Sequence, residues 1–234
     1  MACASLVELF LSNTCSTAPA AFAFLRDSNQ VDTTLTHVEL AERGKRVAAW
    51  LVEHGFGGQR ALLMFPPGLE FVEAFLGCMM ANVVAVPVGP APLRGDEGKV
   101  RVKRMLSILR DCQPAVVLGV RQTLDGAPTF VTDHTEFQSL TWLALDTFDG
   151  WGRYSGLDVA LPSADALTLL QYTSGSTALP KGVMLSHKNI LHNLAQWDYG
   201  LGHDADSKMV CWVPHFHDLG LLYGVLFPMY RGIS

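Results

Sequence analysis

Apolar residues along the chain fall into two patterns, one typical of buried strands and the other typical of amphipathic helices. Apolar runs of strand length occur at 61–65, 83–88, 115–118, 142–145 and 166–170, of which only the last is interrupted, by Thr168. Apolar residues at helical spacing mark helices at 6–11, from Thr36 to near Gly55, at about 70–80, at 100–112 and after Ser186. Uniformly apolar strands that alternate with helices predict an α/β fold, in which layered, mostly parallel sheets are flanked by helices.

Polar residues between these runs refine the prediction. Thr36 and Glu39 have the spacing of a capping box, in which the hydroxyl and the carboxylate bind free backbone amides at a helix start. Ser186 is placed to cap the helix that follows it. Residues 89–98 are rich in glycine and proline and predict a loop, and the pattern between 123 and 163 weakens into short strands and loops.

The composition predicts a globular protein without a nucleic-acid partner. The chain has 234 residues, of which 49% are hydrophobic, and can bury a large core. Its formal net charge of −5 argues against binding to nucleic acid. The basic run 99–104 alternates as a solvated helix face does, with contact to an acidic carrier protein as the alternative. The most apolar stretch, 71–88, is broken by Glu73, Asn82 and Pro87, so we expect no membrane span.

Cysteine usage and the start of the chain both favour a reducing compartment. The five cysteines are scattered, at Cys3, Cys15, Cys78, Cys112 and Cys211. None is part of a Cys-x-x-Cys pair, which indicates reduced and mostly buried thiols. The first cation is Arg26, so the basic region of a signal peptide is missing. We therefore expect a cytoplasmic protein.

The segment 171–182 carries the strongest chemical signal. It follows the predicted strand 166–170 and reads Gln171-Tyr172-Thr173-Ser174-Gly175-Ser176-Thr177-Ala178-Leu179-Pro180-Lys181-Gly182. Backbone amides, short hydroxyls and an ammonium group together suit a polyanion such as a nucleoside triphosphate. A Walker-type loop is excluded, because Pro180 stands at its second glycine and Gly182 stands where a hydroxyl should hold Mg²⁺. A surface turn rich in serine, threonine and glycine is the alternative.

His215 and His217 flank Phe216 ahead of Asp218 and could be mistaken for a metal site. On a strand, residues two apart share a face that Zn²⁺ can use, but the nearby sequence offers no third ligand. We therefore predict no metal site. A histidine that is satisfied inside the core is a further alternative for His217.

Several segments together resemble the adenylate-forming superfamily of AMP-binding enzymes. Residues 172–182 resemble its phosphate-binding loop, with Ala178 where glycine is usual, which costs about 1 kcal/mol if that backbone needs a positive φ. The segments 35–40, 65–71, 84–87, 171–172 and 212–221 look like the amino-terminal region of fatty acyl-AMP ligases. Of these, 66–71 and the Gln-Tyr prefix resemble that branch more than acyl-CoA synthetases or peptide-synthetase adenylation domains.

The resemblance implies a reaction, partners and site residues. A fatty-acid carboxylate attacks the α-phosphorus of ATP, which gives acyl-AMP and pyrophosphate, with Mg²⁺ bridging phosphate oxygens. The acyl group then passes to an acyl carrier protein or to a polyketide or peptide synthase module. The implied phosphate-binding residues are Thr173, Ser174, Gly175, Ser176, Thr177 and Lys181. The implied catalytic residues are Lys181 and His217, and the implied acyl pocket comprises His217, Asp218, Gly220 and Gly224. Core packing explains the apolar run 221–227, which includes Gly224, equally well.

Members of this family continue with an adenine-binding motif, a ribose-binding aspartate, a hinge and a mobile carboxy-terminal domain. None of these is found before Ser234. From the resemblance we expect residues 1–234 to be an incomplete amino-terminal adenylation domain that is inactive by itself. The alternatives are a fragment of an acyl-CoA synthetase, and a non-catalytic remnant that binds nucleotide or a protein partner.

Overall fold

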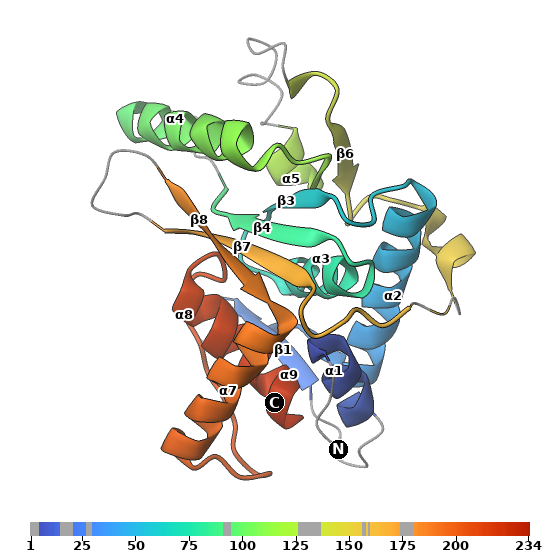
Figure 1. Cartoon of the computed structure of the whole chain (residues 1–234), viewed down its shortest axis with the longest axis vertical. Helices are drawn as coiled ribbons and strands as arrows, with labels where there is room; N and C mark the ends of the chain where they lie inside the picture. The colour runs from blue at the N-terminus through green and yellow to red at the C-terminus, as the bar shows by residue number, and fades with distance from the viewer. Residues whose placement is uncertain are drawn as a thin grey trace.

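The five predicted strands, together with one strand that the sequence did not predict, form a six-stranded sheet at the centre of the molecule (Figure 1). The structure is a computed structural model, and it describes residues 5–14, 21–26, 30–90, 95–125, 137–155, 158, 160–173 and 180–234. The strands lie in the order β6 (Thr141–Ala144), β5 (Val116–Gly119), β3 (Arg60–Met64), β4 (Val84–Val88), β7 (Leu167–Thr173) and β8 (Lys181–Ser186). All neighbouring pairs are parallel except β7 and β8, which are antiparallel. The predicted α/β fold with a mostly parallel sheet is confirmed.

Helices and a small hairpin pack around this sheet. The helices are α1 (Leu6–Thr14), α2 (His37–Glu53), α3 (Leu69–Met80), α4 (Gly95–Cys112), α5 (Arg121–Leu124), α7 (His187–Leu201), α8 (Asp218–Leu221) and α9 (Phe227–Arg231). A 3₁₀ helix, η2 (Gly150–Tyr154), and a π-helical turn, η3 (Leu222–Leu226), complete the helical elements described. The separate antiparallel hairpin is β1 (Ala21–Arg26) with β2 (Gln30–Thr36).

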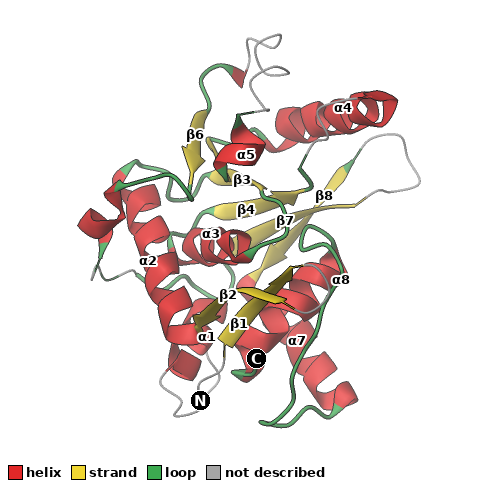
Figure 2. Cartoon of the chain, turned by 180° about the vertical axis from the view of Figure 1, so that it is seen from behind, coloured by secondary structure: helices red, strands yellow, loops and turns green. Residues whose placement is uncertain are grey.

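Helices cover both faces of the sheet because successive strand residues point to opposite sides. On β3, Ala61 and Leu63 belong to a core shared with α2 and α3. Leu62 and Met64 belong to a second core, which lies against α4. Figures 1 and 2 show α3 and α4 on opposite sides of the sheet. Burial on both faces explains why the strands are uniformly apolar.

The capping signals read from the sequence are present. The Thr36 hydroxyl accepts a hydrogen bond from the Glu39 amide at 3.2 Å, and the Glu39 carboxylate accepts from the Thr36 amide at 2.8 Å. Ser186 and Asn189 form the equivalent pair at the start of α7. Helix α2 ends just before Gly55, whose φ of 75° suits glycine. Local polar chemistry therefore sets these helix boundaries.

Three boundaries differ from the sequence-based expectation. Helix α4 begins at Gly95, inside the predicted loop 89–98. A strand, β8, begins inside the segment 171–182 and continues to the start of α7, and the sequence pattern predicts no strand there. It was missed because backbone pairing with β7 holds it, while its side chains are mostly exposed or half-buried. The apolar run 221–227, for which we expected an ordinary helix, contains a π-helical turn in which the Phe227 amide donates to the Leu222 carbonyl.

Helix α9 packs beside α1 near the start of the chain. The side-chain amide of Asn13 donates to the carbonyls of Met229 and Tyr230, at 2.9 and 3.0 Å.

Among the described cysteines, Cys78 and Cys112 are buried and Cys211 is exposed, whereas Cys3 and Cys15 lie outside the described residues. Burial raises the pKa of Cys112 to about 12.

In the described parts of the chain, no helix has both the length and the apolar character needed to cross a membrane.

Candidate functional site

A cavity of about 450 Å³ opens at the carboxyl ends of β4 and β7. These strands pair only at Ala85 and Leu169. Beyond that point β4 contains Pro87, which has no N–H to give to a neighbouring strand. The cavity is lined by Pro87, Val88, Gly89, Pro90, Arg104, Met105, Ile108, Gln171, Tyr172, Thr173, Phe216, His217 and Asp218. Ligands of open α/β sheets commonly bind outside the carboxyl ends of the strands.

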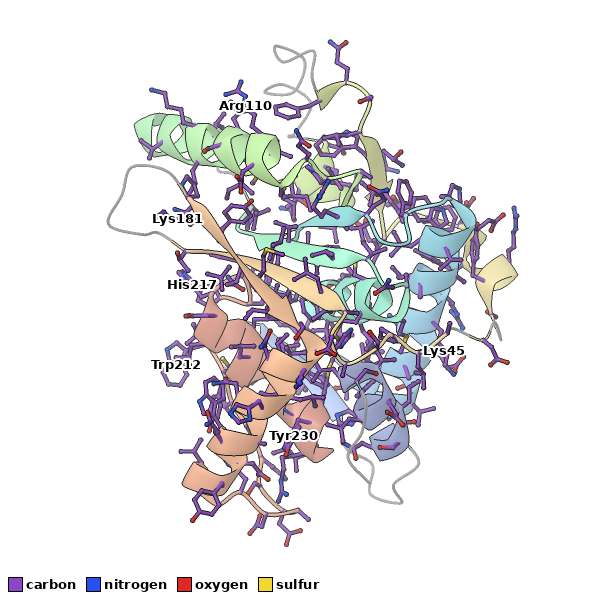
Figure 3. All side chains as sticks on the ribbon, viewed as in Figure 1. Lys45, Arg110, Lys181, Trp212, His217 and Tyr230 are labelled. Carbon is purple, nitrogen blue, oxygen red and sulfur yellow. The ribbon has the colours of Figure 1, made fainter. Side chains whose placement is uncertain are left out.

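The register of β7 and β8 places two of the predicted phosphate-binding residues together. Thr173 lies directly opposite Lys181 in the antiparallel ladder, so the two exposed side chains share one face. Thr173 also lines the cavity, whereas Lys181 stands beside it on β8. Figure 3 shows Lys181 and His217 at the same edge of the molecule. The other predicted phosphate-binding residues, Ser174, Gly175, Ser176 and Thr177, lie outside the described residues, as does Ala178.

Tyr172 points to the face of the sheet opposite to that of Thr173, and it connects the end of β7 to α4. Its hydroxyl donates to the carboxylate of Asp111, and burial together with this hydrogen bond raises the pKa of the phenol. The ring lies over Gly182, where an added Cβ would come within 3.0 Å of the ring. Gly182 therefore makes room for Tyr172, and the phenol remains a donor at neutral pH.

The two histidines of the 215–218 segment lie in a turn and not on a strand, so they do not share a face. The His217 amide donates to the Pro214 carbonyl at 2.9 Å. His215 is buried with its ring 4.0 Å from that of Phe71, between centroids, while His217 is exposed on the cavity wall. The core-histidine alternative therefore describes His215, and His217 faces the cavity.

Buried histidines make the stability of the fold depend on pH. Burial lowers the pKa of His215, and that of His187 at the start of α7, from 6.5 to about 4. The unfolded chain therefore binds these protons first as the pH falls. The stabilisation is complete above about pH 6.5 and is lost towards pH 4, at about 1.4 kcal/mol per pH unit for each histidine.

We expect urea unfolding at pH 6.5 and pH 5 to show this loss in the free energy of unfolding. His187→Gln should reduce the slope by about one proton, because one of the buried imidazoles no longer titrates. A slope identical in the variant and the unaltered protein would contradict the assignment to His187.

Of the predicted acyl-pocket residues, His217 and Asp218 line the cavity and the two glycines do not. The Asp218 carboxylate accepts from the Leu219 amide at 2.7 Å, in the first turn of α8. An added Cβ at Gly220 would lie 2.7 Å from the Val213 carbonyl oxygen, and at Gly224 it would lie 2.5 Å from the Cys211 sulfur. Both glycines therefore allow the helix to approach the preceding chain, and their place in an acyl pocket stays a prediction.

Arg104 is a cavity residue that the sequence did not single out. It lines the cavity, and its guanidinium donates to the Tyr172 carbonyl at 3.5 Å. The run 99–104 reads as a solvated helix face, but Arg104 stands next to Met105 and four residues before Ile108, both of them buried. That position at the border of the apolar stripe is the signal that could have identified it.

The described residues fit a phosphate-bearing ligand better than they fit a metal ion. Thr173, Lys181 and Arg104 offer a hydroxyl, an ammonium and a guanidinium around one end of β7, which suits phosphate oxygens. Asp218 is the one carboxylate among the described cavity residues. No group of three histidine, cysteine or acidic side chains suited to a metal occurs in the described parts of the chain.

Comparisons with known proteins agree with this geometry. The family model described as "AMP-binding enzyme" matches residues 11–234. The chain is 36% identical over 220 residues to the medium-chain-fatty-acid–[acyl-carrier-protein] ligase JamA of Moorena producens, covering 92% of this chain and 36% of JamA. It is 34% identical over 228 residues to the long-chain-fatty-acid–AMP ligase FadD26 of Mycobacterium marinum, covering 92% of this chain and 37% of FadD26.

Solved structures show the same likeness. The fatty acyl-adenylate ligase from L. pneumophila, in complex with acyl adenylate and pyrophosphate, superposes with a TM-score of 0.85 at 31% identity. That superposition covers 99% of this chain and 39% of the ligase. The chain thus spans little more than a third of the length of the relatives it matches.

Proposed function

The chain belongs to the AMP-binding enzyme family, and on that premise we propose that it is part of the amino-terminal adenylation domain of a fatty acyl-AMP ligase. The reaction joins a fatty-acid carboxylate to the α-phosphorus of ATP. A carboxylate oxygen forms the new bond to phosphorus, and the bond to the bridging oxygen breaks with its electron pair leaving on pyrophosphate. The protein contributes mainly by positioning the reactants and stabilising charge.

The observation that carries this proposal is the meeting of β7, β8 and the 214–217 turn at one edge of the sheet. Lys181 and Thr173 hold the β- and γ-phosphates, and Arg104 adds positive charge from the side of α4. His217 orients the carboxylate across the cavity. We propose that Mg²⁺ accompanies ATP on the phosphate oxygens, since the described residues do not build a site of their own for it.

We further propose that the acyl group passes to the phosphopantetheine thiol of an acyl carrier protein in the cytoplasm. One relative, JamA, bears the name of a ligase that acts on such a carrier. The absence of a Cys-x-x-Cys pair and the buried thiols of Cys78 and Cys112 suit a reducing compartment.

ATP–pyrophosphate exchange tests this function. The protein expressed from its full coding sequence should incorporate labelled pyrophosphate into ATP only when a medium- or long-chain fatty acid is present. Amino acids serve as the matched control substrates. Exchange driven by amino acids and not by fatty acids would contradict the ligase assignment, and ATP binding without any exchange would favour the non-catalytic alternative. Acyl transfer to free coenzyme A in preference to a carrier protein would favour an acyl-CoA synthetase.

A further inference from the structure

Gln171 links the two halves of the candidate site. It is 5% exposed, lies on β7 and lines the cavity. Its side-chain nitrogen donates to the Phe216 carbonyl at 2.9 Å, across 45 residues of sequence. Its side-chain oxygen is buried and has no hydrogen-bond partner among the described residues. A buried side-chain amide whose nitrogen donates a hydrogen bond while its oxygen has no partner is uncommon enough to need an explanation.

The hydrogen bond from Gln171 fixes the peptide unit that carries His217. The carbonyl of that unit belongs to Phe216 and accepts from Gln171, while its N–H belongs to His217 and donates to the Pro214 carbonyl. The His217 carbonyl in turn accepts from the Leu221 amide at 2.8 Å. The backbone on both sides of His217 is therefore held, and the tie to the sheet comes from Gln171.

The same residue is connected to the phosphate-binding end of β7. Gln171 and Thr173 are two residues apart on one strand, so their side chains leave the same face of the sheet. Thr173 lies opposite Lys181. One rigid strand thus sets the spacing between the His217 turn and the Thr173–Lys181 pair.

We propose that Gln171 is a positioning residue that holds His217 at the correct distance from the nucleotide phosphates. The inference rests on the proposed function, because it assigns Gln171 the task of aligning the acyl carboxylate with the α-phosphorus. Gln171 acts through His217, because its hydrogen bond holds the peptide unit that carries His217.

A double-mutant cycle tests whether Gln171 acts through His217. Gln171→Met keeps the length and removes the donor, and should lower kcat for fatty-acid-dependent exchange about tenfold, with the KM for ATP changed less than about twofold. In a His217→Ala background the same substitution should change kcat less than about twofold, because the residue it positions is gone. Independent effects that multiply in the double variant would overturn the proposal.

Two further measurements separate positioning from general stability. Gln171→Glu is isosteric and cannot donate to the Phe216 carbonyl, so it should reproduce the effect of Gln171→Met if that hydrogen bond matters. Thr168→Val is the matched control, because Thr168 is 1% exposed on the same strand and its hydroxyl also lacks a partner among the described residues. It should leave kcat unchanged.

Hydrogen exchange gives a result that does not depend on activity. Gln171→Met should speed amide exchange in a peptide that covers 214–221, while peptides from α7 keep their protection. Unchanged exchange at 214–221 would overturn the inference even in a protein without ligase activity. An unaltered protein that shows no fatty-acid-dependent exchange would overturn the proposed function separately.

Discussion

Replacing Lys181 by alanine is expected to lower kcat/KM for ATP about tenfold or more, equivalent to about 1.4 kcal/mol of transition-state stabilisation. Thr173→Ala is expected to have an effect of similar size, because Thr173 and Lys181 lie opposite each other at the end of one ladder and would contact the same phosphates. Both side chains are exposed, so the free energy of unfolding should change little. Steady-state kinetics and urea unfolding measure the two quantities.

Lys188→Ala provides the matched control for the loss of a positive charge. Lys188 lies on α7, seven residues from Lys181, and makes a distant ion pair with Asp165 at 3.8 Å. Its removal should leave kcat/KM unchanged. An equal loss of kcat/KM in the Lys181 and Lys188 variants would indicate that the overall charge of the protein matters, and not the position of Lys181. Normal kinetics in both the Thr173 and Lys181 variants would favour the alternative that the segment 171–182 is a surface turn.

Gly220→Ala is expected to have the largest effect on the fold and the site together. The added methyl group would lie 2.7 Å from the Val213 carbonyl oxygen and would also meet the Pro214 backbone. Backbone atoms cannot rotate away, so α8 and the turn that carries His217 must separate. We expect a loss of about 1–3 kcal/mol in the free energy of unfolding. We also expect a fall of about 100-fold in kcat/KM, because displacement of a catalytic group by about 1 Å has that consequence.

Gly200→Ala separates the packing effect from the loss of a glycine. Gly200 lies in α7, has no heavy atom within 4 Å of an added Cβ, and does not have a positive φ. Alanine there should stabilise the helix by up to about 1 kcal/mol and leave the kinetics unchanged. Thermal melts and exchange assays on both variants give the comparison, and wild-type kinetics in Gly220→Ala would show that the turn tolerates the displacement.

Much of the sheet and of the helix boundaries could be predicted because short-range chemistry determines them. Uniform apolar runs gave the positions of β3, β4 and β5, and the pairing of Thr36 with Glu39 gave the start of α2. The strand β8 could not be predicted in this way. Its backbone bonds go to a distant strand, and Met184 is 67% exposed, so no periodicity marks it.

The sequence could identify which residue types contribute to the candidate site, but it could not show which way their side chains point. Sequence alone pairs His215 with His217, whereas the turn sends one histidine into the core and the other to the cavity wall. The resemblance places Gly220 and Gly224 in an acyl pocket, and the structure shows that the space beside each glycine is occupied by residues of the segment 211–214. Tertiary contacts decide where a small residue leaves room, and the local sequence does not contain that information.

The π-helical turn between α8 and α9 accommodates one additional residue within an otherwise continuous helical segment from Asp218 to Arg231. Each residue of an α-helix advances the side-chain direction by about 100°. A regular helix over the same path would hold one residue fewer, so removing a residue there would restore normal winding without rotating α9. Shortening the chain after the turn would instead rotate the Met229 and Tyr230 carbonyls away from Asn13 and break these two hydrogen bonds between α1 and α9. The length of this segment is therefore adjustable within the π-helical turn and constrained within α9.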